Sequence, residues 1–501
     1  MDEHAAPVHA APVHADPEHA GDAHAAPERT APGRPGRRAV VRALAAVLVA
    51  LAAAALAWWR LGPVTRATTW AEDGGVFLRE QLAYGAGGTL LRPYAGYVHL
   101  VPRLLVDLAV HRPVEQYALT LSASACAVVG VVAASIFLLS RDVVRPWPFR
   151  LVLAAVPVVL PLAPVEISGN VANLHSYAMA LVPWLFSYRA RTWWGAVVVA
   201  LLTLAATLTE LQTLLFLPLL ALAWWPARGL TGRRATPVAR DRLRALPVTV
   251  AALLGCTLQV VAALTTERLS RPGDPSVDDV VRGYLLVPFG GLWDRDVAAV
   301  GSAVARHGWW VMLLPAVGIA VAVLAAFLVA GWRTRWVLVA LVLGSAGVWT
   351  AALVANRSAN GRWGSIAGPA LAAIGPNRYA AAAGMLLLSA VVVAAAALAG
   401  DRWVRQGEGH PTGSRRRRPT RTGGAVRVLR VGLGWCLVAL VVTTAVANAA
   451  PGRTNRSDGP EWAPQVESSV GVCRADPAAV LDVRTVPWAA QVPCALVLRD
   501  R

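Results

Sequence analysis

Two adjacent carboxylates, Glu72 and Asp73, lie just after the first long apolar stretch of the chain, within residues 70–75. Acidic side chains are costly at the edge of a membrane, so packing alone is a poor explanation for the pair. A carboxylate in such a place can act as a general base, and either one can help to hold a divalent metal such as Mg²⁺ or Mn²⁺. The alternative is a helix N-cap, in which an aspartate accepts hydrogen bonds from free backbone N–H groups.

The segment that follows, residues 90–105, mixes aromatic, basic and apolar side chains in the manner of a segment that lies in the membrane interface. Tyr94 and Tyr97 are expected to anchor it at the level of the lipid headgroups. Three basic residues are candidates to meet lipid phosphates or a phosphorylated ligand, namely Arg92, His99 and Arg103. We therefore expect amphipathic helices beside the membrane in this part of the chain.

The composition is that of an integral membrane protein. Of the 501 residues, 56% are hydrophobic and 15% are charged, and the mean hydropathy is +0.51, whereas soluble domains carry about 25% charged residues. The net charge of +18 comes from arginine alone, since the sequence has no lysine. The arginines fall in short loops, where they set membrane topology. We therefore expect an all-α polytopic membrane protein and no nucleic-acid partner.

About eleven apolar stretches have the length that crosses a bilayer. They lie near residues 39–59, 117–139, 151–167, 174–188, 193–209, 211–226, 246–265, 309–330, 336–355, 379–399 and 429–449. The third to the sixth are short and closely spaced. Two long connections remain, residues 60–116 and 267–308, which we call the first and second long loops.

The distribution of arginine predicts the orientation in the plasma membrane. Five loops carry clustered arginines, around Arg141, Arg189, Arg233 and Arg333 and in the run 415–418. All five fall on the cytoplasmic side if the N-terminus is cytoplasmic, because loops rich in arginine stay inside. The two long loops and the C-terminus are then extracytoplasmic.

The two ends of the chain differ from the transmembrane domain expected at residues 37–450. Residues 1–36 are rich in His, Ala and Pro and lack large apolar side chains, so we expect a disordered cytoplasmic tail. Residues 451–501 form a polar extracytoplasmic tail, in which Cys473 and Cys494 are expected to form a disulfide and close a small appendage.

These features together resemble the GT-C superfamily of integral membrane glycosyltransferases. The resemblance rests on an acidic pair after the first span, followed by a long outer loop with the pattern of residues 70–103, and it extends to the rest of the chain by topology only. Actinobacterial membrane proteins of this type show a similar pattern. The resemblance implies a sugar donor linked to a polyprenyl phosphate or pyrophosphate, bound at the outer face by juxtamembrane helices of the loop.

The resemblance also implies roles for individual residues. One acid of the loop removes the proton of the acceptor hydroxyl or, in some members, helps to hold a metal. Family patterns stress the second acid more often, so Asp73 is expected to be the base, and Glu72 to orient the substrate or assist a metal. Arg378, which begins the tenth span, corresponds to a basic residue of a late outer loop that binds phosphate.

Polar residues at the ends of other spans are further candidates. Glu166 ends the third span and is followed by Asn173 and His175, and Glu210 lies between the fifth and sixth spans. Asn173, His175 and Glu210 are expected to bind sugar hydroxyls or the donor phosphate, and ordinary turn chemistry is the alternative.

The sequence thus predicts a glycosyltransferase that moves a sugar from a polyprenyl-phosphate donor to a cell-envelope glycan, lipid or protein acceptor. No nucleotide-binding loop or zinc-ligand spacing is present in the sequence. A transporter or flippase of lipid-linked glycans is one alternative, although few charges lie inside the spans and no repeat is evident. A non-catalytic membrane scaffold is the other.

Overall fold

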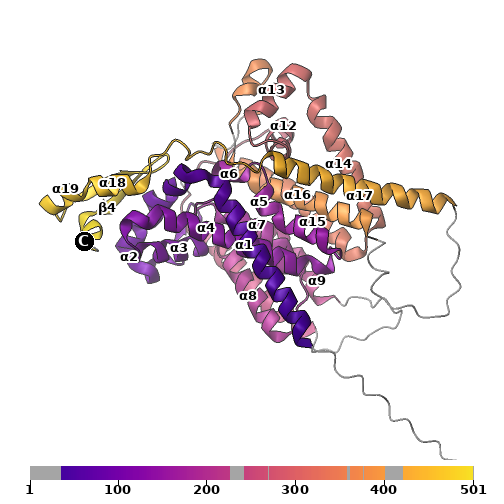
Figure 1. The fold of residues 1–501 in the computed structure, drawn as a ribbon, viewed down its shortest axis with the longest axis horizontal. Coiled ribbons are helices and arrows are strands. Elements are labelled where there is room, and N and C mark those ends of the chain that lie inside the picture. Colours follow the sequence, from indigo (N-terminus) through magenta and orange to yellow (C-terminus); the bar gives the residue numbers. More distant parts are fainter. Residues whose placement is uncertain are drawn as a thin grey trace, which may run out of the picture. The chain divides into compact units, whose positions relative to one another are not determined.

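The computed structural model describes residues 35–225, 242–268, 270–357, 362–375, 377–400 and 421–499. These residues are mostly helical, and Figure 1 labels the helices along the chain. The contacts given below all belong to the compact unit formed by residues 45–501. Residues 1–34 of the expected tail, the arginines of 228–240 and the run 415–418 lie outside the described residues.

Among the described residues, eight helical segments are long and apolar enough to cross a membrane. They belong to α1 (Pro35–Ala67), α4 (Tyr117–Leu139), α5 (Trp147–Val159) with α6 (Ala163–Glu166), α11 (Leu246–Thr265), α14 (Trp310–Val329), α15 (Trp332–Ala355), α16 (Arg378–Ala399) and α17 (Arg421–Ala447). Helices satisfy every backbone polar group within the segment, as hydrocarbon requires. The chain is therefore an α-helical multi-pass membrane protein.

Three shorter helical segments coincide with the remaining expected spans. They are α7 (Leu174–Ser187), α8 (Trp193–Thr207) and the 3₁₀ segment η4 (Leu211–Leu220) continued by α9 (Ala221–Trp224). Helices α7 and α8 have 14 and 15 residues, which is fewer than a helix that crosses a membrane usually has. Each of the eleven apolar stretches is thus helical.

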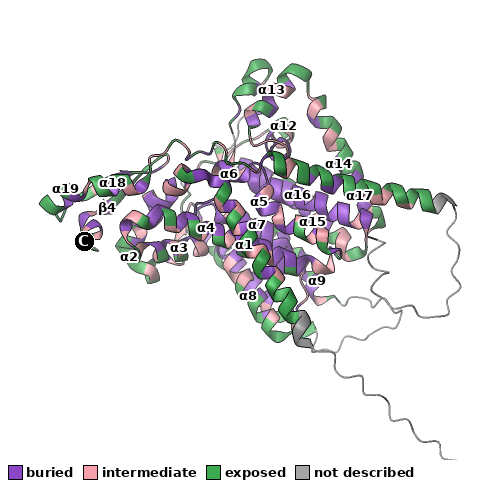
Figure 2. Cartoon of the chain, in the orientation of Figure 1, coloured by how far each residue is buried: buried purple, intermediate pink, exposed green. Residues whose placement is uncertain are grey.

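Helix α16 is the most buried of the long apolar helices. In its apolar window 94% of the residues are buried, against 22% in α14 and in α17, and Figure 2 shows the same contrast in colour. It packs against α5, α7, α14, α15 and α17. The small residues 380–384 permit this close approach of neighbouring helices. The exposed Leu and Val side chains of α14 and α17 suit contact with lipid.

The first long loop folds into helices and one tight hairpin. Its elements are η1 (Asp73–Leu78), α2 (Arg79–Thr89), β1 (Pro93–Tyr94), β2 (Tyr97–Val98), α3 (Leu100–Val110) and η2 (Val114–Gln116). Helix α3 buries Arg103 and Val106 on one face and leaves Leu104 and Leu108 exposed on the other. Helix α1 continues beyond the expected end of the first span and bends at Gly62, which has a φ of 71° and precedes Pro63.

The second long loop is also ordered into helical segments. It contains α12 (Val277–Tyr284), η5 (Leu285–Phe289), η6 (Gly290–Leu292) and α13 (Val297–His307), and η8 (Gly368–Ala373) lies in the loop before α16. Helix α12 begins with a capping box, in which Ser276 and Asp279 satisfy each other's backbone N–H groups.

Residues 451–499, here called the C-terminal module, contain α18 (Trp462–Ser468), α19 (Val470–Ala475), β3 (Val480–Arg484), β4 (Ala489–Pro493) and α20 (Cys494–Leu498). Strands β3 and β4 are antiparallel, and Cys473 and Cys494 are joined by a disulfide. The module closed by this disulfide also contacts the first long loop. The Val486 backbone N–H donates to the Thr69 carbonyl at 3.1 Å and the Trp462 indole donates to the Val114 carbonyl at 2.7 Å, so the module is docked on the first long loop.

Candidate active site

The two acids of the first long loop have different surroundings. The side chain of Asp73, the first residue of η1, is buried and accepts the backbone N–H groups of Val171 at 3.1 Å and Ala172 at 2.9 Å. The Tyr117 hydroxyl donates to the Asp73 carbonyl at 2.8 Å. Burial raises the pKa of Asp73 to about 7, although these N–H groups and nearby Arg456 favour the charged form. Asp73 therefore joins the first long loop to the loop before α7.

Glu72 instead faces a polar cavity. Its Oε1 lies 3.1 Å from Nη1 of Arg378, the first residue of α16. Its Oε2 is buried and accepts no hydrogen bond among the described residues. Buried polar atoms are nearly always paired, so an orphaned carboxylate oxygen indicates a place for a donor that comes from outside the chain. Of the two acids, Glu72 lines the cavity and Asp73 does not, so the geometry favours Glu72 as the candidate base.

The polar cavity has a volume of about 350 Å³ and collects residues from distant parts of the chain. The sequence-predicted residues that line it are Glu72, Tyr94, Tyr97, His99, Asn173, His175, Glu210 and Arg378. The ends of η4 and α15 complete the wall through Leu211, Ala351 and Ala355. Asp73, Arg92 and Arg103 are not among the lining residues.

Arg378 lies between two carboxylates. Besides Glu72, its Nη1 is 3.9 Å from Oε1 of Glu166. The other oxygen of Glu166 accepts a hydrogen bond from Nδ2 of Asn455 at 3.2 Å. An arginine that faces two acids is held in one orientation, and a phosphate group can replace either acid as its partner.

The phosphate role expected for Arg92 and Arg103 is not supported. Both turn to Glu80 of α2, with distances of 3.5 Å from Arg92 Nε and 2.5 Å from Arg103 Nη2 to its carboxylate. The Arg103 guanidinium also lies over the Phe77 ring, 4.5 Å from its centre, and this ring separates it from the cavity. These arginines therefore tie α3 and the hairpin to α2.

The β1–β2 hairpin forms the aromatic wall of the cavity. Ala95 and Gly96 have φ values of 52° and 89°, as a two-residue hairpin turn requires. A Cβ on Gly96 would lie 2.7 Å from Cγ of Arg268, so a glycine is needed where that arginine crosses the turn. Tyr97 stacks on His99 with ring centres 4.0 Å apart.

The protonation states of His99 and Tyr94 follow from their burial. Burial holds the pKa of His99 well below its usual range, so the imidazole is neutral and does not serve as a cation for phosphate. Burial also raises the pKa of Tyr94 to about 12, which keeps its hydroxyl protonated. His99 Nδ1 faces the Tyr97 carbonyl at 3.1 Å. The hairpin therefore offers neutral hydrogen-bonding groups and ring faces.

A second polar pair lies across the cavity. His175 Nδ1 is 2.8 Å from Oε2 of Glu210, whose Oε1 accepts the backbone N–H of Gln212 at 2.7 Å. Glu210 thus caps η4 and orients the imidazole, which leaves the other ring nitrogen of His175 for a ligand. Asn173 is less available, because it donates its Nδ2–H and its backbone N–H to Oδ1 of Asn170 at 2.9 and 3.0 Å.

Two basic residues near the site did not emerge from the sequence. Arg268 lines the cavity from the start of the second long loop, and Arg456 of the C-terminal module is buried beside Asp73. The only sequence feature that points to these two arginines is that each follows an expected span on the extracytoplasmic side. Many other arginines share that property.

The carboxylates do not fit a metal site. Both oxygens of Asp73 already accept backbone N–H groups, and Glu72 pairs with Arg378. Among the described residues no group of three or more His, Cys, Asp or Glu side chains is arranged to hold a metal ion. No catalytic step is therefore derived through a metal.

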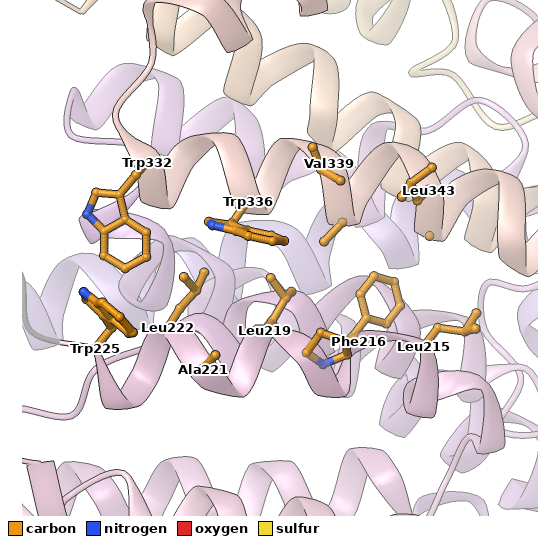
Figure 3. Close-up of a pocket in the computed structure, with 13 residues that line it drawn as sticks. Leu215, Phe216, Leu219, Ala221, Leu222, Trp225, Trp332, Trp336, Val339 and Leu343 are labelled. Atoms are coloured by element: carbon orange, nitrogen blue, oxygen red, sulfur yellow. The ribbon is translucent and has the colours of Figure 1, made fainter.

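An apolar groove of about 820 Å³ lies further along two of the elements that line the polar cavity. Figure 3 shows Phe216 and Leu219 of η4 facing Trp336 and Leu343 of α15 across it. At one end the rings of Trp225 and Trp332 approach with centres 6.3 Å apart. The same two elements reach the polar cavity at Leu211 and Ala355. A polar cavity and an apolar groove thus share one pair of helices.

No protein-family profile, curated protein or solved structure matches the chain.

Proposed function

We propose that the chain is a GT-C-type glycosyltransferase that moves a sugar from a polyprenyl-phosphate donor to an extracytoplasmic cell-envelope acceptor. Glu72 is its general base and Arg378 binds the donor phosphate. The observation that carries this proposal is the state of Glu72, with one oxygen held by Arg378 and the other buried without a partner in a polar cavity. An acceptor hydroxyl would supply the missing donor.

The proposed reaction needs one base and one cation. The acceptor hydroxyl transfers its proton to Glu72 while its oxygen forms a bond to the anomeric carbon of the sugar. The bond between that carbon and the phosphate oxygen breaks, and the electron pair leaves with the phosphate. Arg378 stabilises the charge of the departing phosphate, with Arg268 as the second cation of the cavity. His175, oriented by Glu210, is placed to hydrogen-bond the sugar.

The two sites along η4 and α15 support a lipid-linked donor. A polyprenyl phosphate has a small anionic head and a long apolar chain. The polar cavity would take the head, and the apolar groove in Figure 3 would take the chain, because both are bounded by these two elements. Eleven crossings with a cytoplasmic N-terminus would place the cavity at the outer face. The arginine-rich loops are the support for that orientation.

The test is sugar transfer in membranes that contain the full chain, with a panel of polyprenyl-phosphate sugars as donors. Glu72→Gln keeps the shape of the side chain but removes the base, and we expect the rate of transfer to fall by about 10²–10⁴-fold. Glu467→Gln is the control, because Glu467 is exposed in the C-terminal module. Transfer by Glu72→Gln at the wild-type rate would contradict the assignment, and movement of the intact donor across the bilayer would favour a flippase.

A further inference from the structure

Three consecutive residues of the C-terminal module enter the space between the loops that carry Glu72 and Glu166. The Thr454 hydroxyl is 2.8 Å from the hydroxyl of Thr65, near the end of α1. The backbone N–H of Asn455 donates to the Val165 carbonyl at 2.8 Å. The chain therefore returns, after its last apolar helix, to both segments that lead to the two carboxylates facing Arg378.

Arg456 makes the most extensive of these contacts. Its guanidinium donates to the carbonyls of Thr68 at 3.0 Å, Ser168 at 2.7 Å and Gly169 at 3.0 Å. One planar group thus holds the backbone four residues before Glu72 and the backbone just after Glu166. The fork of donors on an arginine is rigid, so it fixes the relative position of the two loops as well as their separation.

Burial of the charged Arg456 guanidinium has a desolvation cost that its contacts must offset. Only 3% of the residue is exposed. Burial lowers the pKa of its guanidinium to about 10, so the group remains charged at neutral pH with Asp73 as the nearby negative charge. An apolar side chain of similar volume would fill the same space without this desolvation cost. Only a charged fork, however, can hold carbonyls of both loops at once.

Asn455 extends the same arrangement to Glu166, the second carboxylate that faces Arg378. Its Nδ2 donates to Oε2 of Glu166, which leaves Oε1 turned to Arg378. Asp73 links the two loops a second time through Val171 and Ala172. Glu72, Glu166 and Arg378 therefore meet in a geometry that depends on a segment outside the membrane helices.

We propose that Arg456, assisted by Asn455, is a positioning residue that sets Glu72 and Glu166 against Arg378. The C-terminal module is then part of the catalytic apparatus, although it supplies no group to the reacting atoms. The effect of Arg456 on catalysis rests on the proposed function. Its effect on the position of the two loops rests on the contacts alone. The two consequences are tested separately.

The structural arm measures hydrogen–deuterium exchange of the full chain in lipid nanodiscs. With Arg456→Gln we expect faster exchange in peptides that cover residues 68–78 and 166–173, and no change in peptides from α11 and α14. Arg456→Lys should give a smaller increase, because an ammonium keeps the charge but not the fork. Arg453→Gln is the matched control, since Arg453 is exposed and contacts only Asp458 among the described carboxylates. Unchanged exchange in the two loops, or an equal increase throughout, would overturn the proposal.

The catalytic arm uses the donor that the transfer assay identifies. Asn455→Ala alters an exposed residue and should fold, and Arg456→Lys keeps the positive charge of the buried position. For both we expect kcat per folded molecule to fall by about tenfold to a hundredfold with little change in the donor KM, because misplaced catalytic groups slow the chemical step. A loss of folded protein with unchanged kcat would mean a merely structural role and overturn the proposal. If the wild-type chain transfers no sugar, the proposed function fails, and the exchange arm still decides whether Arg456 positions the loops.

Discussion

The backbone N–H of Ala172 donates a hydrogen bond of 2.9 Å to Oδ1 of Asp73. The second oxygen of that carboxylate accepts the N–H of Val171, so both oxygens of Asp73 are engaged by the loop before α7. Its neighbour Glu72 faces the cavity and Arg378. Adjacent acids therefore have separate tasks, one in holding two loops together and one in the proposed chemistry.

Replacement of Asp73 by asparagine should lower stability. The amide nitrogen of asparagine cannot accept a hydrogen bond, so one of the two buried N–H groups loses its partner. At about pH 4, where the contribution of Asp73 is largest, we expect the free energy of unfolding to fall by about 1–3 kcal/mol, measured by thermal unfolding in detergent. Glu72→Gln should have a smaller effect, because its amide oxygen can still accept from Arg378. A larger loss for Glu72→Gln would reverse the roles assigned to the two acids.

Asp73 should also make stability depend on pH. Burial raises its pKa from 3.8 to about 7, so between these values the folded protein keeps a proton that the unfolded chain has lost. The contribution of Asp73 to stability is therefore complete below pH 3.8 and is lost as the pH rises toward 7. The stability of wild type relative to Asp73→Asn should decrease between about pH 4 and about pH 7. A constant or increasing difference in chemical denaturation would contradict this expectation.

Arg378 should control the affinity for the donor phosphate. Its guanidinium faces Glu72 and Glu166, and a phosphate must compete with these acids for it. We expect Arg378→Gln to lower kcat/KM for the donor by about a hundredfold, and Arg378→Lys to lower it less, because an ammonium keeps the charge without paired donors. Arg306→Gln, an exposed change in α13, is the control. An unchanged donor KM in Arg378→Gln would exclude phosphate binding by this residue.

The helices could be predicted from the sequence, but the catalytic contacts could not. Hydrocarbon permits few backbone structures, so a long apolar stretch is a strong signal for a helix, and every expected span is helical. The third to the sixth stretches are short and closely spaced, and the helical segments in the last three of them are shorter than ordinary spans. Helix α1 continues beyond residue 59 because the chain bends at Gly62–Pro63 and resumes the helix to Ala67.

The site was predicted in its residue types and only partly in its geometry. Four predicted residues do meet in one cavity, namely Glu72, His175, Glu210 and Arg378. Each was expected at the extracytoplasmic end of an apolar segment. The choice between Glu72 and Asp73 depended on the direction of side chains in η1, a π-helical turn that neighbouring residue types do not specify. Arg456 was missed because its partners are backbone carbonyls almost three hundred residues away or more in sequence.

Arg103 should prove structural. It is 1% exposed and pairs with Glu80 at 2.5 Å. Removal of Arg103 leaves the partly buried Glu80 with only the longer contact to Arg92 at 3.5 Å, so Arg103→Met should destabilise the protein by about 1–3 kcal/mol. The double variant Arg103→Met with Glu80→Gln should recover part of that loss in thermal unfolding. A stable Arg103→Met protein with a raised donor KM would instead restore the phosphate role.

The disulfide between Cys473 and Cys494 should secure the C-terminal module on the first long loop. The bond closes a loop with a sequence separation of 21, and a cross-link of this size contributes about 3 kcal/mol by restricting the unfolded chain. Cys473→Ser with Cys494→Ser should therefore increase the rate of proteolysis within residues 451–499. Because Val486 and Trp462 bond to the first long loop, cleavage within that loop should increase as well. Cys436→Ser, a change at an exposed free cysteine of α17, should leave both rates unchanged. Equal proteolysis of the double variant and wild type would show that packing alone holds the module.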